Sequence, residues 1–416
     1  MTTLPKKLSA RVTGGAKFAR TALRVGSRIA EQRWAEARLP GDFAPRDTDR
    51  FVACAYFASD LSSVYQLEQW LWSFEQCADA LRSDGHGSEP FGIVVRDAQV
   101  ARRVSGQTAL PVRFSRLTRG FDRFMSSECL RAVFYVNQAI GNFQALRFPR
   151  PAHVHLSHGE SEKISMISNQ LKAYDYVFTA GPAARERIRR ALIGMPEEHM
   201  IDVGRPPLDQ PRTLPQEWID FAEAAPEGQV VFWAPTWEGD SPSMAYGTLP
   251  ETGAAIAEAL LGSGCRVILR PHPRTGVLDP RFARALRDVE RSLEEHPRGF
   301  VDRTPSVGWQ FDVADVAVAE MSSVAFDWLS TGKPLVMVEP SDPRADILSG
   351  GLFDRVPTIR REDVSAIAST VLEAPADSDT SAHYLGTSEP GLQILQFIDA
   401  AKQVVAGRTE VLSSRH

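Results

Sequence analysis

Two histidines in the sequence follow short apolar runs, in settings suited to acid–base and anion chemistry. The first, His158, comes after the run 153–157 and before Gly159, where a missing side chain allows close backbone approach. Histidine titrates near neutral pH and can accept a proton from a hydroxyl nucleophile. His158 is therefore a candidate general base, although a histidine hydrogen-bonded in a strand–loop corner would leave the same pattern.

The second histidine lies in the segment Arg270-Pro271-His272-Pro273, directly after the apolar run 265–269. Proline on each side of His272 fixes two φ angles and favours extended backbone at Arg270 and His272. An arginine can give two donors to a phosphate, and a protonated histidine can offset charge on a leaving phosphate. We predict an anion site here, in preference to a stiff turn around a buried guanidinium.

Ser322 and Ser323 stand where a strand at 316–319 gives way to a helix. The free N–H groups and dipole of a helix start attract anions, and two hydroxyls add donors. Ordinary serine capping gives the same residues and is compatible with that role. Asp327 lies four residues after Ser323, on the same helix face. We expect Asp327 and Glu320 to orient ligand hydroxyls or basic groups rather than to bind metal.

Two further segment ends carry polar candidates. Thr236 follows the run 230–233 and can donate to a phosphate, whereas core packing is the expected role of Trp233. Arg205 ends the first half of the chain, where it either faces a cleft or pairs with a surface acid. The sequence has no Walker loop, no GxGxxG, no GxSxG and no Cys/His zinc spacing, and its aspartates do not cluster. We therefore expect no cofactor and no metal.

These segments belong to an alternation of short apolar runs with helices that begins at residue 51. We predict strands at 51–57, 91–95, 133–137, 153–157, 174–179, 200–203, 230–233, 265–269, 299–301, 316–319 and 335–338. We predict helices near 61–82, 185–192, 218–224, 251–262, 280–294, 322–331, 362–373 and 392–405. Such alternation indicates parallel sheets with helices on both faces, where ligands bind beyond the carboxyl ends of the strands.

A proline-rich linker at 205–228 separates two such halves. The pattern predicts the GT-B architecture: two doubly wound Rossmann-like α/β domains facing a cleft. We expect a basic amphipathic arm at 1–40, an N-terminal Rossmann-like domain at 50–208, a C-terminal Rossmann-like domain at 228–390, and a helix at 391–410 that closes back on the first domain.

The bulk composition fits this division. The chain has 416 residues, of which 43% are hydrophobic and 24% charged, which suits two globular domains with full cores. Its four cysteines lie far apart, as expected of free thiols in a reducing compartment. No run approaches about 18 apolar residues, so we expect no membrane span, and no compact apolar core marks a secretion signal.

Charge is concentrated in residues 1–40, which carry +7 while the rest of the chain carries −12. Arg20, Arg24 and Arg28 form an i, i+4, i+8 row. This spacing predicts an amphipathic helix with a basic face. Such a helix can lie on an anionic bilayer, where each basic residue contributes about 1 kcal/mol of binding free energy. A helix packed on the body with a solvated basic face is the alternative. Nucleic acid is disfavoured as a partner because the remainder of the chain is acidic.

Taken in order, the motifs resemble those of the CDP-glycerol glycerophosphotransferase family, the primases and polymerases of teichoic-acid-type polymers. The matching segments are Ser157-His158-Gly159 with Lys163, Tyr174-Asp175-Tyr176, Gly204-Arg205-Pro206, Ala234-Pro235-Thr236-Trp237, Arg270-Pro271-His272-Pro273, Ser322-Ser323, Phe326-Asp327 and Lys333-Pro334. Ser157 stands where the family has Trp, Glu320 where it has Asp, and Glu160 and Glu162 follow where it has a small and an apolar residue.

The resemblance implies a catalytic pair of His158 and His272, with the nucleotide held mainly by the C-terminal domain. It further implies transfer of glycerol phosphate or a related polyol phosphate from a CDP-activated donor to a lipid-linked or polymer acceptor, at the inner face of the cell membrane. A GT-B glycosyltransferase that uses a nucleotide sugar has the same fold. The departures at Ser157 and Glu320 keep open a non-catalytic, membrane-associated scaffold.

Overall fold

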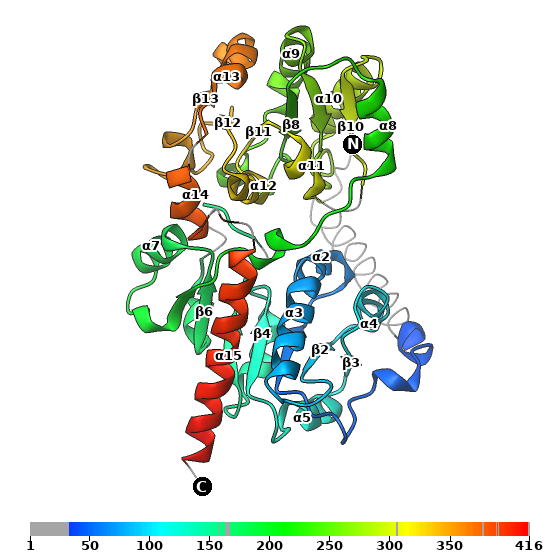
Figure 1. Cartoon of the computed structure of the whole chain (residues 1–416), viewed down its shortest axis with the longest axis vertical. Coiled ribbons are helices and arrows are strands. Elements are labelled where there is room, and N and C mark those ends of the chain that lie inside the picture. The colour runs from blue at the N-terminus through cyan, green and yellow to red at the C-terminus, as the bar shows by residue number, and fades with distance from the viewer. Residues whose placement is uncertain are drawn as a thin grey trace, which may run out of the picture. The chain divides into compact units, whose positions relative to one another are not determined.

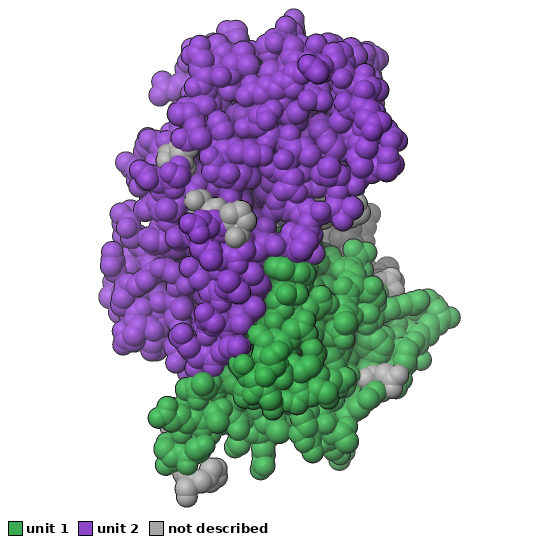
Figure 2. Space-filling model, in the orientation of Figure 1, with its two compact units in different colours: residues 1–153, 404–416 green, residues 154–403 purple. Residues whose placement is uncertain are grey.

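The computed structural model describes residues 33–157, 159–162, 167–304, 307–376, 378–387, 389 and 391–414. The chain forms two compact units, coloured separately in Figure 2. Unit 1 comprises residues 1–153 and 404–416, and unit 2 comprises residues 154–403. Most of the predicted basic arm lies outside the described residues, as do His158 and Lys163.

Two sheets form the framework. The first has the strand order β3-β2-β1-β4-β5-β6-β7, and the second has the order β10-β9-β8-β11-β12-β13. Neighbouring strands run parallel, as β1 does with β2 and β8 with β11. The strands are β1 Ala53–Phe57, β2 Phe91–Val95, β3 Val112–Phe114, β4 Ala132–Tyr135, β5 Ala152–His155, β6 Tyr176–Thr179, β7 Met200–Asp202, β8 Val230–Ala234, β9 Arg266–Leu269, β10 Gly299–Val301, β11 Val316–Ala319, β12 Leu335–Val338 and β13 Thr358–Ile359.

Helices fill the connections between the strands (Figure 1). They are α2 Tyr65–Glu68, α3 Leu71–Ser83, α4 Ala98–Ser105, α5 Thr118–Met125, α6 Phe143–Leu146, α7 Pro182–Ala191, α8 Gln216–Ala224, α9 Leu249–Gly262, α10 Pro280–Glu294, α11 Trp309–Val313, α12 Ser323–Trp328, α13 Ile367–Glu373, α14 Ser378–Leu385 and α15 Leu392–Ser413.

The second sheet is buried on both faces, which is why its strands read as continuous apolar runs. Val231 and Trp233 of β8 lie in one buried cluster with α9 and α10. Phe232 and Ala234 lie in another cluster with α11 and α12. This alternation confirms the core role predicted for Trp233. It also confirms the predicted fold class, two parallel α/β sheets.

Prediction and structure differ at element ends and in several short elements of both halves. The strands predicted at 91–95, 299–301, 316–319 and 335–338 have those limits in the structure. The sequence did not reveal the strands β3 and β13 or the helices α4, α5, α6, α11 and α14. The final helix, expected at 392–405, continues to Ser413.

Cys54, Cys77 and Cys265 are buried free thiols and Cys129 is partly exposed. Within the part of the chain that the structure describes, no helix combines the length and apolarity needed to cross a bilayer.

Candidate active site

Three of the predicted segments meet at the carboxyl edge of the second sheet. Strands β9, β8 and β11 are adjacent, and Trp233 of β8 pairs with Leu269 of β9. Thr236, Arg270 and Ser322 follow the ends of these three strands. In doubly wound folds, this edge is where ligands bind. Segments more than 30 residues apart in sequence therefore converge as the strand-end argument predicts.

Neighbouring residues contact the His272 ring through its Nδ1 atom and through one of its faces. The backbone N–H of Arg274 donates to Nδ1 of His272 over 3.1 Å. The imidazole stacks on the Trp237 indole, with centroids 6.0 Å apart and an interplanar angle of 17°. A nitrogen that accepts a hydrogen bond carries no proton, so the geometry favours the neutral tautomer with its proton on Nε2. The sequence had suggested a protonated ring.

Arg270 is anchored through one terminal nitrogen. Its Nη1 donates to the Asp302 carboxylate at 2.9 Å and to the Thr304 carbonyl at 2.5 Å. The side chain is 11% exposed. Within the described ranges, Nε and Nη2 donate to no protein group. The guanidinium is thus fixed in place while two of its donors remain for an anion.

Glu320 is buried and bound on both oxygens. Oε2 accepts the backbone N–H of Thr236 at 2.7 Å, and Oε1 accepts the backbone N–H of Thr248 at 2.7 Å and its hydroxyl at 2.5 Å. Burial raises the pKa of Glu320 to about 7, against the opposing effect of these hydrogen bonds. The carboxylate therefore links the ends of β8 and β11. The Thr236 hydroxyl, in a residue 1% exposed, has no partner among the described residues.

The raised pKa of Glu320 predicts a pH-dependent stability. Because folding favours the protonated form, its contribution is present below about pH 4.5 and is lost as pH rises through about 7. This loss amounts to roughly 3 kcal/mol. Urea unfolding at several pH values should show the fall in wild type and not in the Glu320→Gln variant. The exposed Glu362→Gln variant should follow wild type, and parallel curves for all three would contradict the assignment.

The loop after β5 lies against the start of α12. A Cβ added at Gly159 would be 3.2 Å from Cβ of Ser323, so glycine permits the approach. Ser157 has a φ of 69°, in the left-handed region, and its hydroxyl donates to the Gly159 carbonyl at 3.0 Å. Ser322 is buried and makes no side-chain capping bond to α12, whereas Ser323 is exposed.

Two carboxylates, the buried Glu160 and the half-buried Glu162, hold this loop. Glu160 forms an ion pair with Arg187 of α7. Glu162 accepts hydrogen bonds from the backbone N–H of Leu352, at 3.2 Å, and from the Tyr384 hydroxyl of α14. Burial raises the pKa of Glu162 and lowers that of Arg187 to about 10. The acidic residues that set this sequence apart from the family motif therefore anchor the loop to other elements of unit 2.

Arg205 and Asp327 bind each other. Nε of Arg205 lies 3.1 Å from Oδ1 of Asp327, with side chains 5% and 16% exposed. The backbone N–H of Arg205 donates to Oε1 of Gln393. The partner of Arg205 is thus a largely buried acid on α12 and not the surface acid that the sequence offered as one alternative.

Sequence reasoning missed several residues that position the site. Asp302 directly follows β10, so the strand-end argument applied to every strand would have found it. Thr248, Arg187 and Tyr384 carry no such signal, because each meets its partner only through tertiary folding. Among the described residues, no three His, Cys, Asp or Glu side chains converge to hold a metal ion.

Comparison with solved structures shows a shared fold. A putative UDP-N-acetylglucosamine 2-epimerase from Listeria monocytogenes matches with a TM-score of 0.57 and 11% identity, over 85% of this chain and 96% of that one. Another UDP-N-acetylglucosamine 2-epimerase matches with a TM-score of 0.52 and 10% identity, over 84% and 94%. The wall teichoic acid polymerase TagF matches with a TM-score of 0.48 and 13% identity, over 95% and 99%.

Sequence comparison adds the family. No curated protein sequence matches the chain. Residues 152–342 match the family model described as CDP-Glycerol:Poly(glycerophosphate) glycerophosphotransferase. This range contains the loop after β5, the three strand ends of the second sheet and α12. Over residues 152–342, somewhat less than half of its length, the chain is similar to the CDP-glycerol:poly(glycerophosphate) glycerophosphotransferase family.

Proposed function

We propose that this chain transfers glycerol phosphate, or a related polyol phosphate, from a CDP-activated donor to a hydroxyl of a lipid-linked or polymer acceptor, with release of CMP, in the synthesis of a cell-wall or capsule polymer. The observation that carries the proposal is the family match over 152–342, the range that holds both candidate histidines. The described contacts of His272 and Arg270 support it, because they hold donors at a strand edge where a phosphate can bind.

In the proposed reaction, His158 accepts the proton of the acceptor hydroxyl as that oxygen attacks the distal phosphorus of the donor. The new O–P bond forms while the bond to the CMP oxygen breaks in line. Arg270 donates to the departing phosphate through Nε and Nη2, and neutral His272 donates through Nε2. This role for His272 replaces the protonated one, since its Nδ1 accepts from Arg274.

The remaining candidates bind or position. Thr236, Ser322 and Ser323 offer hydroxyls to the donor phosphates, and Gly159 leaves room beside Ser323. The pair of Arg205 with Asp327 and the buried Glu320 act by fixing these segments, because their described partners are protein groups.

A donor screen tests the proposal. Purified protein is offered CDP-glycerol, CDP-ribitol and common nucleotide sugars, with thermal stabilisation, nucleotide release and product mass as measurements. We expect stabilisation by a CDP-polyol, release of CMP and a new phosphodiester. Release of a nucleoside diphosphate with sugar transfer would identify a glycosyltransferase instead, and absence of nucleotide binding would support a scaffold.

We also propose that residues 1–40 hold the enzyme on the anionic inner face of the cell membrane, where a lipid-linked acceptor lies. Replacing Arg20, Arg24 and Arg28 by Ala should lower partitioning onto phosphatidylserine vesicles about 10²-fold, at about 1 kcal/mol per charge. Sedimentation with the vesicles measures this. The matched control replaces Arg284, Arg287 and Arg291, which are exposed on α10, and should bind like wild type. Equal loss in both variants would contradict a specific arm.

A further inference from the structure

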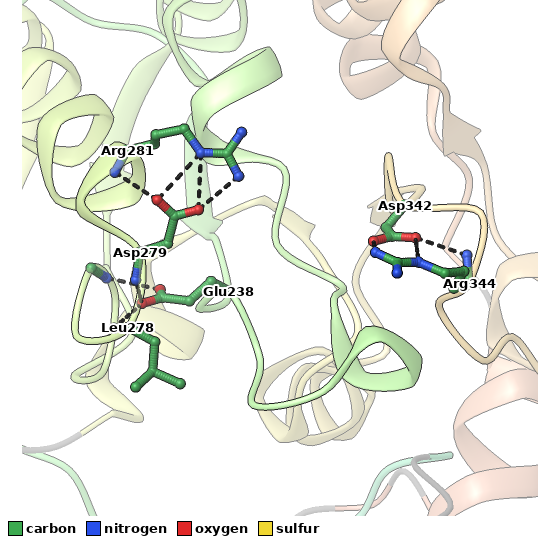
Figure 3. Close-up of polar contacts among 7 residues, drawn as sticks. Glu238, Leu278, Asp279, Arg281, Asp342 and Arg344 are labelled. Atoms are coloured by element: carbon green, nitrogen blue, oxygen red, sulfur yellow. Dashed lines mark hydrogen bonds and ion pairs between the residues drawn. The ribbon is translucent and has the colours of Figure 1, made fainter. Parts of the chain in front are cut away.

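The carboxylate of Glu238 gathers three backbone N–H groups of one loop. Oε2 accepts from Gly276 at 2.8 Å, and Oε1 accepts from Leu278 at 2.6 Å and from Asp279 at 3.0 Å (Figure 3). Burial alone would raise the pKa of Glu238, but these donors hold it below its ordinary value. The side chain is therefore an ionised acceptor that ties the end of β8 to the loop after His272.

The far end of that loop is fixed on α10. Asp279 caps α10 by accepting the backbone N–H of Arg281 at 2.9 Å (Figure 3). Gly276 has a φ of 79°, and a Cβ added there would lie 2.5 Å from Cβ of Ala283. The loop therefore has little freedom where Glu238 binds it.

The near end of the same loop supplies the backbone N–H that hydrogen-bonds to the imidazole of His272. The N–H of Arg274 donates to Nδ1 of His272, and the N–H of Thr275 donates to the His272 carbonyl at 2.9 Å. Trp237, the residue before Glu238, stacks on the His272 ring, and the Arg274 guanidinium carbon lies 3.7 Å from the centroid of the Trp237 indole. Of these two contacts of the ring, Arg274 lies just before the segment that Glu238 binds, and Trp237 directly precedes Glu238 itself.

We infer that Glu238 is a positioning residue that sets the orientation and tautomer of His272 by holding the 274–279 loop. This inference rests on the proposed function only for its catalytic consequence. When the carboxylate is lost, three N–H groups lose their acceptor, and the loop keeps its attachment to α10 but loses its tie to the end of β8, which frees its near end at Arg274. The Arg274 N–H then leaves Nδ1, and the proton of a neutral His272 distributes over both nitrogens.

The test follows the imidazole directly by ¹⁵N NMR of the full chain labelled at histidine, at a pH where histidines are neutral. The signals of His272 are identified by their absence in the His272→Gln variant. We expect wild type to show one tautomer, protonated on Nε2. In Glu238→Ala, the Nδ1 and Nε2 shifts of His272 should converge towards a mixture. Glu238→Gln keeps an oxygen for Leu278 and Asp279 and provides a milder variant if the alanine protein does not fold.

Two controls lie within the same unit. His296 also accepts a backbone N–H on Nδ1, from Arg298 at 3.2 Å, so its signals report whether any change is general. Asp342→Asn removes a partly exposed carboxylate that binds Arg344 in a different loop (Figure 3). Both His296 in the Glu238 variants and His272 in Asp342→Asn should keep their wild-type shifts.

Turnover adds the catalytic consequence. For Glu238→Ala we expect kcat to fall on the order of 10-fold to 10²-fold, because the donor is misplaced. We expect KM for the donor to change less than about threefold, since binding groups remain. Unchanged His272 shifts in both Glu238 variants, or equal changes at His296, would overturn the inference even if transfer is confirmed. If wild type transfers no polyol phosphate, the proposed function fails, whereas the tautomer comparison still decides the role of Glu238.

Discussion

Replacing His272 by alanine is expected to lower the rate of CMP release at least about 10²-fold. The imidazole stacks on Trp237 and accepts the Arg274 N–H on Nδ1, which leaves Nε2–H as its donor. Alanine removes that donor, so the leaving phosphate keeps Arg270 and the nearby hydroxyls but loses the imidazole. The proposed general base, His158, should show a loss of similar size in the alanine variant. Steady-state assays with saturating CDP-glycerol measure both rates.

The chain offers a matched control for this prediction. His296 makes the same local contact, with Nδ1 accepting the N–H of Arg298, but it lies between α10 and β10, away from the carboxyl edge of the sheet. His296→Ala should therefore keep near-wild-type turnover, although it loses the same kind of backbone N–H to Nδ1 hydrogen bond as His272→Ala. Near-wild-type rates in both His158→Ala and His272→Ala would remove the mechanism, whatever the control shows.

All strands of the second sheet except the two-residue edge strand β13 could be predicted from sequence, because the central strands of this sheet are buried on both faces. Its strands are short apolar runs bounded by charged or turn residues, and three of them have the predicted limits. Strand β3 escaped notice for the opposite reason. Its central residue is Arg113, whose buried guanidinium pairs with Asp49 at 2.7 Å. A charge whose partner lies far away in sequence makes a buried strand look polar, so no local pattern reveals it.

The sequence predicts which strand ends carry polar side chains, but it does not predict which groups those side chains bind. A polar residue after a strand can turn either to a ligand or to the protein, and the sequence does not distinguish the two. Arg270 illustrates this, because its Nη1 binds Asp302 while two donors remain. Glu320 interacts more completely with the protein than Arg270 does, since protein donors bind both of its oxygens. Such side chains act on a substrate through the segments they hold.

Arg205→Ala is expected to lower the free energy of unfolding by about 3–5 kcal/mol, the usual cost of breaking a buried ion pair. The substitution leaves the Asp327 carboxylate, which is 16% exposed, without its Arg205 partner. It also leaves a cavity where the Arg205 side chain, 5% exposed, had packed. Urea unfolding followed by circular dichroism measures the loss. The double variant with Arg205→Met and Asp327→Leu should recover most of it, because apolar residues of similar size need no partner.

Arg212→Ala provides the comparison, because Arg212 also pairs with an aspartate at 3.1 Å but with side chains 18% and 51% exposed. Solvent screens that pair, so we expect a loss of at most about 1 kcal/mol. If Arg205 instead served mainly as a donor-binding group, Arg205→Ala would unfold like wild type and raise KM for the CDP-activated donor. A small stability loss together with a large KM effect would therefore reverse the assignment, and it would return Arg205 to the substrate side of the site.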